Sequence, residues 1–226
     1  MKYRTLWVGA TSLALAFAVT TNISAALSAT DLNVWVGPSA GPGINEAVLV
    51  VEWADGAPGL AWGYRWPATQ NATGRDLLAA VIGTDARFRA DGLGTGFVAN
   101  LSFDADRNGA PERFHPGFDP VTTEFWNYFV NNDVYYDPAD FTKNGHVVPP
   151  ATSVVSLGNP YAEGRWVSSS TGVLDRPLVH GSWDGFVYAA MSNGPLEPVA
   201  APPIPEPASC LLAALALALS GRRQRW

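Results

Sequence analysis

The sequence predicts a mainly β protein, either a β-sandwich or a β-rich α+β fold with one short helix near residues 74–82. Two observations favour this fold class. Short runs of β-branched and aromatic residues recur along the chain, separated by turns rich in Gly, Pro, Asn and Asp. Helical spacing of apolar residues is clear in one segment only. Without its two ends the chain keeps about 180 residues, enough for one domain with a hydrophobic core.

The first 26 residues predict a cleaved signal peptide. A positively charged start at residues 1–4 precedes an apolar run over residues 6–19 and small residues at 24–26. This order is typical of secretory leaders. We expect signal peptidase to cut after Ala26, with Ser28 as the alternative site, and to release a body that extends from residue 27 to residue 194.

Three strands are predicted in the first part of the body, at residues 33–37, 46–53 and 60–66. The second is a β-branched apolar run, which is typical of a central strand covered on both faces. In the third, Trp62, Tyr64 and Trp66 alternate with smaller residues and therefore share one face. Pro67 is predicted to end this strand.

One helix follows these strands. Thr73 is its predicted N-cap, and Asp76 stands at the third helical position, which is a variant of the capping box. Leu77 and Val81 begin an apolar stripe at helical spacing. Gly83 is predicted to close the helix.

The remaining strand candidates lie at residues 94–102, 122–130, 153–157, 165–168 and 185–190. A segment rich in Asp, Asn, Gly and Pro separates the first two and predicts turns. Residues 195–204 are rich in Pro and Ala, and this composition predicts a stiff, extended linker between the body and the C-terminal tail.

The charge of the body excludes some classes of partner. All 20 acidic residues lie between Asp31 and Glu206, where 9 basic residues oppose them, so this region carries a net charge of −11. Such an acidic surface argues against binding to nucleic acid or anionic lipid. The single cysteine, Cys210, lies in the tail, so no disulfide can cross-link the body.

The tail has three parts in a fixed order. Pro205, Glu206 and Pro207 form an extended, non-helical motif. The apolar run that follows predicts a single transmembrane helix over residues 208–220. A run of twelve or so residues spans roughly 18–20 Å, less than the ~30 Å hydrocarbon core. Three arginines end the chain and would stay on the cytoplasmic side: Arg222, Arg223 and Arg225.

Residues 205–226 closely resemble the PEP-CTERM sorting signal of Gram-negative bacteria, in the Pro-Glu-Pro motif, the short apolar helix and the terminal arginines. The resemblance implies recognition and cleavage by exosortase, a membrane cysteine transpeptidase. It implies a transient stay in the inner membrane, followed by delivery to the cell surface or the extracellular matrix. An ordinary C-terminal membrane anchor is the alternative.

A second resemblance concerns the body. The segments Thr-Gly-Arg-Asp-Leu-Leu at 73–78, Phe-Trp-Asn-Tyr-Phe-Val-Asn at 125–131 and Asp-Gly-Phe-Val-Tyr at 184–188 resemble the β-grasp domain found at the C-terminus of transcobalamin-type proteins. The resemblance implies a β-grasp fold and carries over no ligand residues.

One loop is a candidate calcium site. Asp104, Asp106 and Asn108, followed by a glycine, have the spacing that opens a calcium-binding loop, and Glu112 stands at its ninth position. The twelfth position holds His115, where the motif has a bidentate Glu. A plain Asx-turn, without an ion, is the alternative.

Aromatic residues form the second candidate site. Trp62, Tyr64 and Trp66 could stack on the sugar rings of an extracellular polysaccharide, since all three lie on one strand face. Alternating aromatics also fill the cores of β proteins, so core packing is the other interpretation.

No catalytic signature occurs in the sequence. His115, His146 and His180 lie far apart on predicted loops, and no nucleophile motif or phosphate-binding loop is present. We therefore expect an exported, non-enzymatic surface or matrix protein. A carbohydrate- or small-ligand-binding module is the first alternative. A hydrolase with paired carboxylates is the second.

Overall fold

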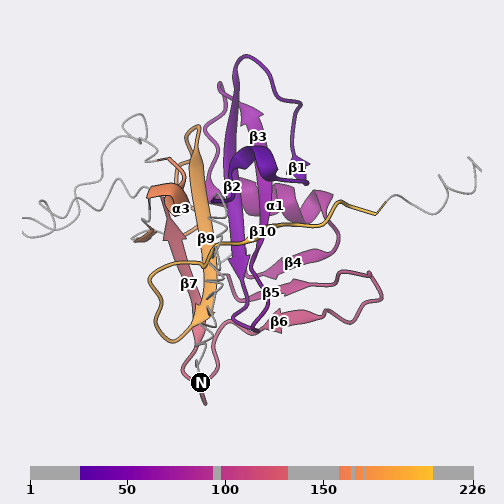
Figure 1. Ribbon diagram of the computed structural model, residues 1–226, viewed down its shortest axis with the longest axis vertical. Coiled ribbons are helices and arrows are strands. Elements are labelled where there is room, and N and C mark those ends of the chain that lie inside the picture. Colours follow the sequence, from indigo (N-terminus) through magenta and orange to yellow (C-terminus); the bar gives the residue numbers. More distant parts are fainter. Residues whose placement is uncertain (1–25, 94–97, 132–157, 164–165, 170–171, 206–226) are drawn as a thin grey trace, which may run out of the picture.

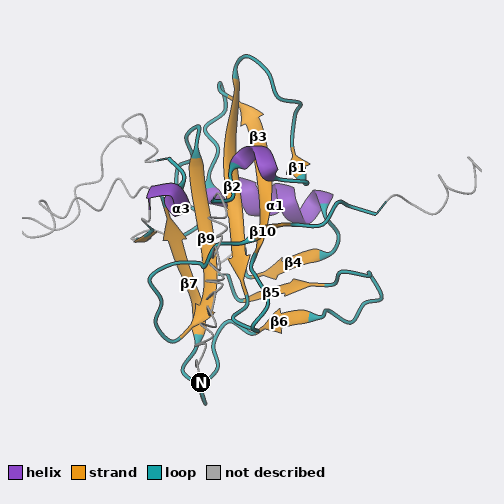
Figure 2. Ribbon diagram, viewed as in Figure 1, coloured by secondary structure: helices purple, strands orange, loops and turns teal. Residues whose placement is uncertain are grey.

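The computed structural model describes residues 26–93, 98–131, 158–163, 166–169 and 172–205 (Figure 1). This part of the chain forms two β-sheets, of seven and three strands, and one helix of 11 residues, Gly74–Thr84 (α1) (Figure 2). The mainly β prediction with one short helix near residues 74–82 is therefore confirmed. Residues 1–25 of the predicted leader, the strand candidate at 153–157 and the tail from residue 206 lie outside the described residues.

The large sheet has the order β1-β3-β2-β9-β7-β8, and β10 also pairs with β3. Its strands are β1 (Trp35–Val36), β2 (Ile44–Glu52), β3 (Leu60–Pro67), β7 (Phe125–Val130), β8 (Val167–Ser168), β9 (Ser182–Ala189) and β10 (Val199–Ala200). The two central strands, β2 and β9, are parallel to each other. β2 pairs with β3 in an antiparallel manner, and β9 pairs with β7 in the same way. The sheet is therefore mixed, and the chain passes from β3 to β7, on the other side of the central pair, through α1 and the small sheet.

The small sheet is antiparallel and consists of β4 (Phe88–Asp91), β5 (Asn100–Phe103) and β6 (Arg113–His115). Its strands run across the direction of β2 and β3 (Figure 1). β5 covers only the end of the strand predicted at 94–102, and β6 lies in the segment predicted to form turns. The three residues of β6 carry no strand signal of their own. They form a strand because they pair with β5. A 3₁₀ turn at Ala29–Asp31 (η1) and a short helix at Pro160–Glu163 (α3) complete the described elements.

β2 lies at the centre of the core. It is buried from Ala47 onward, and its side chains alternate between two hydrophobic clusters. Leu49 and Val51 face α1 and the small sheet, whereas Val48 and Val50 face the opposite side of the sheet. Both faces of this strand are covered, which explains its continuous apolar run.

The N-terminus of α1 has the predicted capping box. The Thr73 hydroxyl oxygen accepts a hydrogen bond from the Asp76 N–H, and an Asp76 carboxylate oxygen accepts one from the Thr73 N–H at 2.8 Å. The helix runs to Thr84, one residue beyond the predicted end at Gly83. It continues because the Asp85 N–H still donates to the Val81 carbonyl, at 2.7 Å.

The opposite face of the large sheet is covered by side chains from short segments. Trp35, Tyr161 and Trp166 pack there against a buried cluster that includes Val50 and Trp183. Gly63 allows Trp35 to lie against β3, since a Cβ at residue 63 would come within 2.3 Å of the indole ring. This glycine is required by close approach.

The Pro/Ala segment predicted to be a stiff, extended linker packs on the body. The N–H groups of Val199 and Ala201 donate to the carbonyls of Gly59 and Ala61, both at 3.0 Å. The open edge of β3 supplies these acceptors, and an edge strand tolerates neighbouring prolines that cannot donate. The composition of the segment predicted its extended conformation. Its pairing with β3 is a tertiary contact, which composition does not indicate.

Within the described residues, no helix has the length and apolar character needed to cross a membrane. The transmembrane segment predicted at residues 208–220 lies outside them.

Candidate functional site

The structure places Trp62, Tyr64 and Trp66 in the hydrophobic core. Their side chains lie on the face of β3 that α1 and the small sheet cover, and they are exposed by only 0, 6 and 1%. A ring that stacks on a sugar needs an accessible face, and none of the three has one. The aromatic-platform hypothesis is thus contradicted, while their predicted location on one face of the strand is correct.

The acidic loop brings three of its four predicted ligands together. One carboxylate oxygen from each of Asp104, Asp106 and Glu112 lies within 4.8 Å of the others. Asp104 is buried directly after β5, whereas Asp106 and Glu112 are exposed. Carboxylate oxygens at such separations could hold a hard cation such as Ca²⁺.

The fourth predicted ligand takes part in a turn. The Asn108 side-chain oxygen accepts the N–H of Ala110 at 2.7 Å, and the Asn108 amide nitrogen donates to Asp106 at 2.9 Å. Asp104 accepts the N–H groups of Asn108 and Gly109 at 3.1 and 2.8 Å. The loop therefore has its own hydrogen bonds of the Asx-turn type, and three carboxylates remain as candidate cation ligands.

His115, at the twelfth position of the loop, is directed elsewhere. Its imidazole stacks on Tyr188, with ring centroids 4.0 Å apart and an angle of 10° between the rings. The pattern of a helical calcium loop is therefore incomplete at its twelfth position.

The chain also has a polar pocket that no sequence motif indicated. This amide pocket has a volume of about 410 Å³ and lies where β2 begins, between residues 68–72 and residues 177–180. Its lining includes the side-chain amides of Asn45, Gln70 and Asn71 together with His180. The volume lies within the ~300–1,000 Å³ typical of small-molecule sites.

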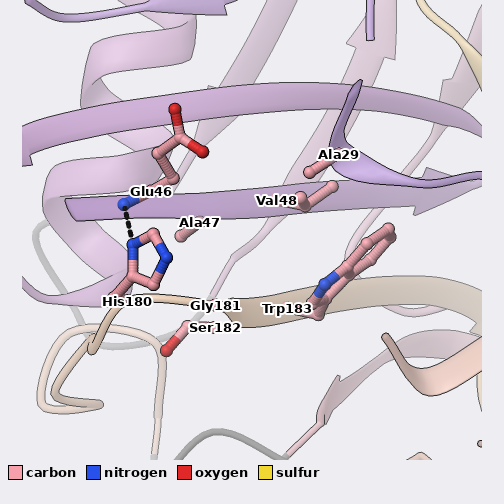
Figure 3. A pocket seen from close by; sticks show the side chains of 8 residues that line it. All are labelled: Ala29, Glu46, Ala47, Val48, His180, Gly181, Ser182 and Trp183. Atoms are coloured by element: carbon pink, nitrogen blue, oxygen red, sulfur yellow. Dashed lines mark hydrogen bonds between the residues drawn. The ribbon is translucent and has the colours of Figure 1, made fainter. Parts of the chain in front are cut away.

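His180 also lines a smaller cavity of about 90 Å³, together with Val48 and Trp183 (Figure 3). The His180 Nδ1 atom accepts a hydrogen bond from the Glu46 N–H at 3.2 Å. In the neutral imidazole this bond requires the proton to be on Nε2, which makes Nε2 a donor for a ligand.

In the part of the chain that the structure describes, the amide pocket is lined by polar and apolar groups without a charged side chain. No Asp, Glu, Lys or Arg is among the described residues that line it, although the body as a whole is strongly acidic. Within the described part of the chain, the side chains of Asn45, Gln70 and Asn71 make no hydrogen bond with protein groups. The pocket thus offers both amide donors and amide acceptors to a ligand.

Comparison with known protein families, with curated proteins and with solved structures gave no match. The interpretation of both candidate sites therefore rests on their own geometry and chemistry.

The fully enclosed carboxylates Asp85 and Asp184 could suggest hydrolytic chemistry, but each forms an ion pair with a buried arginine, Arg87 or Arg176. Asp184 accepts hydrogen bonds from Arg176 at 3.0 Å and from the Tyr128 hydroxyl at 2.5 Å. Burial raises the pKa of Asp184, and Arg176 and Tyr128 offset this effect only in part. The carboxylate lies under the first residue of α1, where a Cβ on Gly74 would come within 2.9 Å of it. Asp184 is therefore enclosed by the protein, with its ion pair in the core.

Sequence reasoning missed the amide pocket because its walls come from three distant segments. The neighbouring Gln70 and Asn71 were a visible polar pair beyond Pro67, but nothing local connects them to His180. The parallel pairing of β2 with β9 brings the start of both strands to the same edge of the sheet.

Proposed function

We propose that this chain is an exported, non-enzymatic protein of the cell surface or extracellular matrix, delivered by exosortase-type processing of its tail. The order of leader, compact β-rich body, Pro-Glu-Pro motif, apolar run and terminal arginines supports the proposal. The apolar run suits a transient span of the inner membrane, since it is short for a permanent anchor. The terminal arginines oppose translocation of that end.

The position of Leu27 supports leader removal after Ala26. The Leu27 nitrogen lies 2.7 Å from a carboxylate oxygen of Glu197. A cut after Ala26 would convert this amide into an α-ammonium group and create an ion pair with Glu197. A charged N-terminus at this atom would be favourably placed.

The strand arrangement supports the β-grasp resemblance of the body. The order β3-β2-β9-β7, with a parallel central pair and α1 on one face, is the arrangement of a β-grasp sheet. We propose this fold for the core of the body, with β1, β8 and β10 as additions at its edges. No ligand residue follows from the resemblance.

For the body we propose binding of an uncharged, hydroxyl-rich ligand of the saccharide class in the amide pocket. The observation that carries this proposal is the presence of three amides without protein partners in a pocket that lacks charged side chains. Hydroxyl groups both donate and accept hydrogen bonds, as amide side chains do, so the two are complementary. An extracellular polysaccharide is the corresponding ligand for a matrix protein.

Intact mass of the protein released from its producing cell tests the delivery proposal. We expect a chain that begins at Leu27 and ends at the Pro-Glu-Pro region. Replacing Arg222, Arg223 and Arg225 with Gln should leave the precursor uncleaved, and deleting residues 205–207 should retain it in the inner membrane. Released protein that still ends at Trp226 would overturn the sorting function in favour of a plain anchor.

Retention on polysaccharide purified from the same matrix tests the ligand proposal. Loss of one ligand hydrogen bond in Gln70→Ala or Asn71→Ala should weaken binding roughly two- to tenfold. Asn193→Ala, which changes an exposed amide outside the pocket, is the matched control. Equal retention of the wild type and all three variants would reject the amide pocket as the site.

Calcium binding by the acidic loop is a second candidate function. The observation in its favour is the approach of the Asp104, Asp106 and Glu112 carboxylates to within 4.8 Å of one another. An ion there would stabilise the hairpin between β5 and β6 without any role in delivery.

A further inference from the structure

The segment that leads into the processing motif is bound to the body along its length. We propose that the folded body holds Pro205, the exposed first residue of the Pro-Glu-Pro motif, at its own surface, so that the sorting peptidase acts beside the body and cuts efficiently only when the core has formed. This inference rests on the proposed sorting function. It modifies the expectation that residues 195–204 form a stiff, extended linker between the body and the tail.

The first part of the segment is held by backbone and side-chain hydrogen bonds. The Leu196 N–H donates to Glu52 at 2.7 Å, before β10 pairs with β3. Beyond β10, Ala201 is fully buried, and its carbonyl accepts a hydrogen bond from the Asn33 side chain at 3.3 Å. The chain thus remains on the body up to residue 201.

Arg87 holds the next two residues. Its Nη2 atom donates to the Pro202 carbonyl at 2.7 Å, and its Nη1 atom donates to the Pro203 carbonyl at 3.2 Å. The same guanidinium forms a two-bond ion pair with Asp85, with both distances 2.7 Å. We call this arrangement of Asp85, Arg87 and the two proline carbonyls the Arg87 clamp.

The Arg87 clamp depends on the folded core. Arg87 and Asp85 are exposed by only 2% and 0%, and they lie between the end of α1 and the start of β4. Asp85 also accepts a hydrogen bond at 3.1 Å from the indole N–H of Trp62, a core residue of β3. The clamp can therefore form only after α1, β3 and β4 have packed together.

The processing motif begins directly after the clamp. Ile204 packs against the main hydrophobic cluster, and Pro205 is the first residue of the motif. At most about 7 Å of extended chain separates Pro203 from Pro205. The segment leaves the body near the end of α1 (Figure 1). A peptidase that reads Pro205, Glu206 and Pro207 therefore approaches this part of the surface.

An insertion distinguishes two explanations of efficient cleavage: that the body holds the motif in position, or that the motif only needs to be exposed. Gly-Ser-Gly-Ser placed between Ile204 and Pro205 of the full chain leaves every contact of the clamp intact and moves the motif away from the body. In pulse–chase labelling of the producing cell, we expect cleavage of the precursor to slow roughly tenfold, because the motif loses its fixed position. The same insertion between Ser39 and Ala40, in an exposed turn, is the control and should be cleaved at the wild-type rate.

A second variant loosens the clamp itself. Arg87→Lys keeps a cation beside Asp85 but lacks the planar fork that reaches both proline carbonyls. It should also accumulate precursor, whereas Arg89→Lys, two residues away and largely exposed, should not. Wild-type cleavage of the chain with the insertion at Pro205 would overturn the inference while sorting stands. A wild-type chain that keeps its tail would overturn the sorting function and the inference with it.

Discussion

Arg87 donates a 2.7 Å hydrogen bond to the carbonyl oxygen of Pro202, which lies 115 residues later in the chain. The guanidinium is buried, and it joins the turn after α1 to the segment that precedes the Pro-Glu-Pro motif. This contact makes residues 199–203 part of the domain. Because the same guanidinium pairs with Asp85 in the core, the stability of the body is coupled to the position of residues 202 and 203.

Arg87→Ala should destabilise the body by about 3–5 kcal/mol, because it leaves the Asp85 carboxylate buried without its cation. Urea unfolding followed by tryptophan fluorescence measures the change. Arg89→Ala is the matched control, and its effect should stay within about 0.5 kcal/mol, as expected for an exposed side chain. Similar stabilities for the two variants would show that the Arg87 ion pair contributes little.

Stability should fall in acid partly through Asp85. Burial acts to raise the pKa of this carboxyl, but the hydrogen bonds from Arg87 and Trp62 and the charge of Arg87 together lower it below its ordinary value of 3.8. As pH falls, the unfolded chain therefore takes up the proton first. The stabilisation by the ionised carboxylate is present above about pH 4 and is lost as pH falls through the folded-state pKa.

Comparison with Asp85→Asn checks this pH dependence. The difference in melting temperature between wild type and variant should be large at neutral pH and should shrink below about pH 4. A difference that stays constant across this range would mean that the titration of Asp85 is not the cause.

Trp62→Ala should cost about 3–5 kcal/mol of unfolding free energy, because it leaves a cavity in the core and removes a hydrogen bond to Asp85. Phe114→Ala provides the control, since the Phe114 side chain is 52% exposed on β6. Chemical denaturation of both variants gives the comparison. A stable, soluble Trp62→Ala protein would contradict the core location of this residue.

Gly63→Ala should destabilise the protein by about 1–3 kcal/mol, because its new Cβ would overlap the Trp35 ring. Gly41→Ala is a suitable control, since a Cβ there would meet nothing within 4 Å and its backbone is not left-handed. Thermal unfolding of the two variants measures the difference. Equal melting temperatures would show that Trp35 moves away without cost.

Calcium should raise the melting temperature if the acidic loop binds it, since a ligand of the folded state stabilises that state by mass action. At a calcium concentration 100 times the dissociation constant, the gain is about 2.7 kcal/mol. Asp106→Ala should abolish the rise, and Asp175→Ala, an exposed carboxylate outside the cluster, should keep it. No calcium-dependent shift in the wild-type protein would reject the site.

Several elements could be predicted because their signals are local. The apolar run of β2, the alternation of β3 and the capping residues Thr73 and Asp76 each act within a few residues of chain. The end of α1 was predicted one residue early, since the last hydrogen bond from Asp85 outweighs the helix-ending tendency of Gly83. β6 was missed because its strand structure comes from β5 and not from its own sequence.

In the candidate sites, too, local features could be predicted from the sequence and tertiary features could not. The three carboxylates of the acidic loop lie within nine residues, so their spacing in the sequence already brings them near one another. Whether the aromatic face of β3 is exposed or buried cannot be read from alternation, because both locations produce the same pattern. The structure resolves this question by packing α1 and the small sheet over Trp62.

The sequence by itself determined the mainly β class of the body and the start of α1, and it contains the terminal motifs on which the delivery proposal depends. Only the tertiary structure decided that the segment around residues 199–203 belongs to the domain and that His180 meets Gln70 and Asn71 in one pocket. The physical reason is the range of the interactions. Periodicity and capping act between near neighbours, whereas the Arg87 clamp and the amide pocket exist only after distant strands have paired.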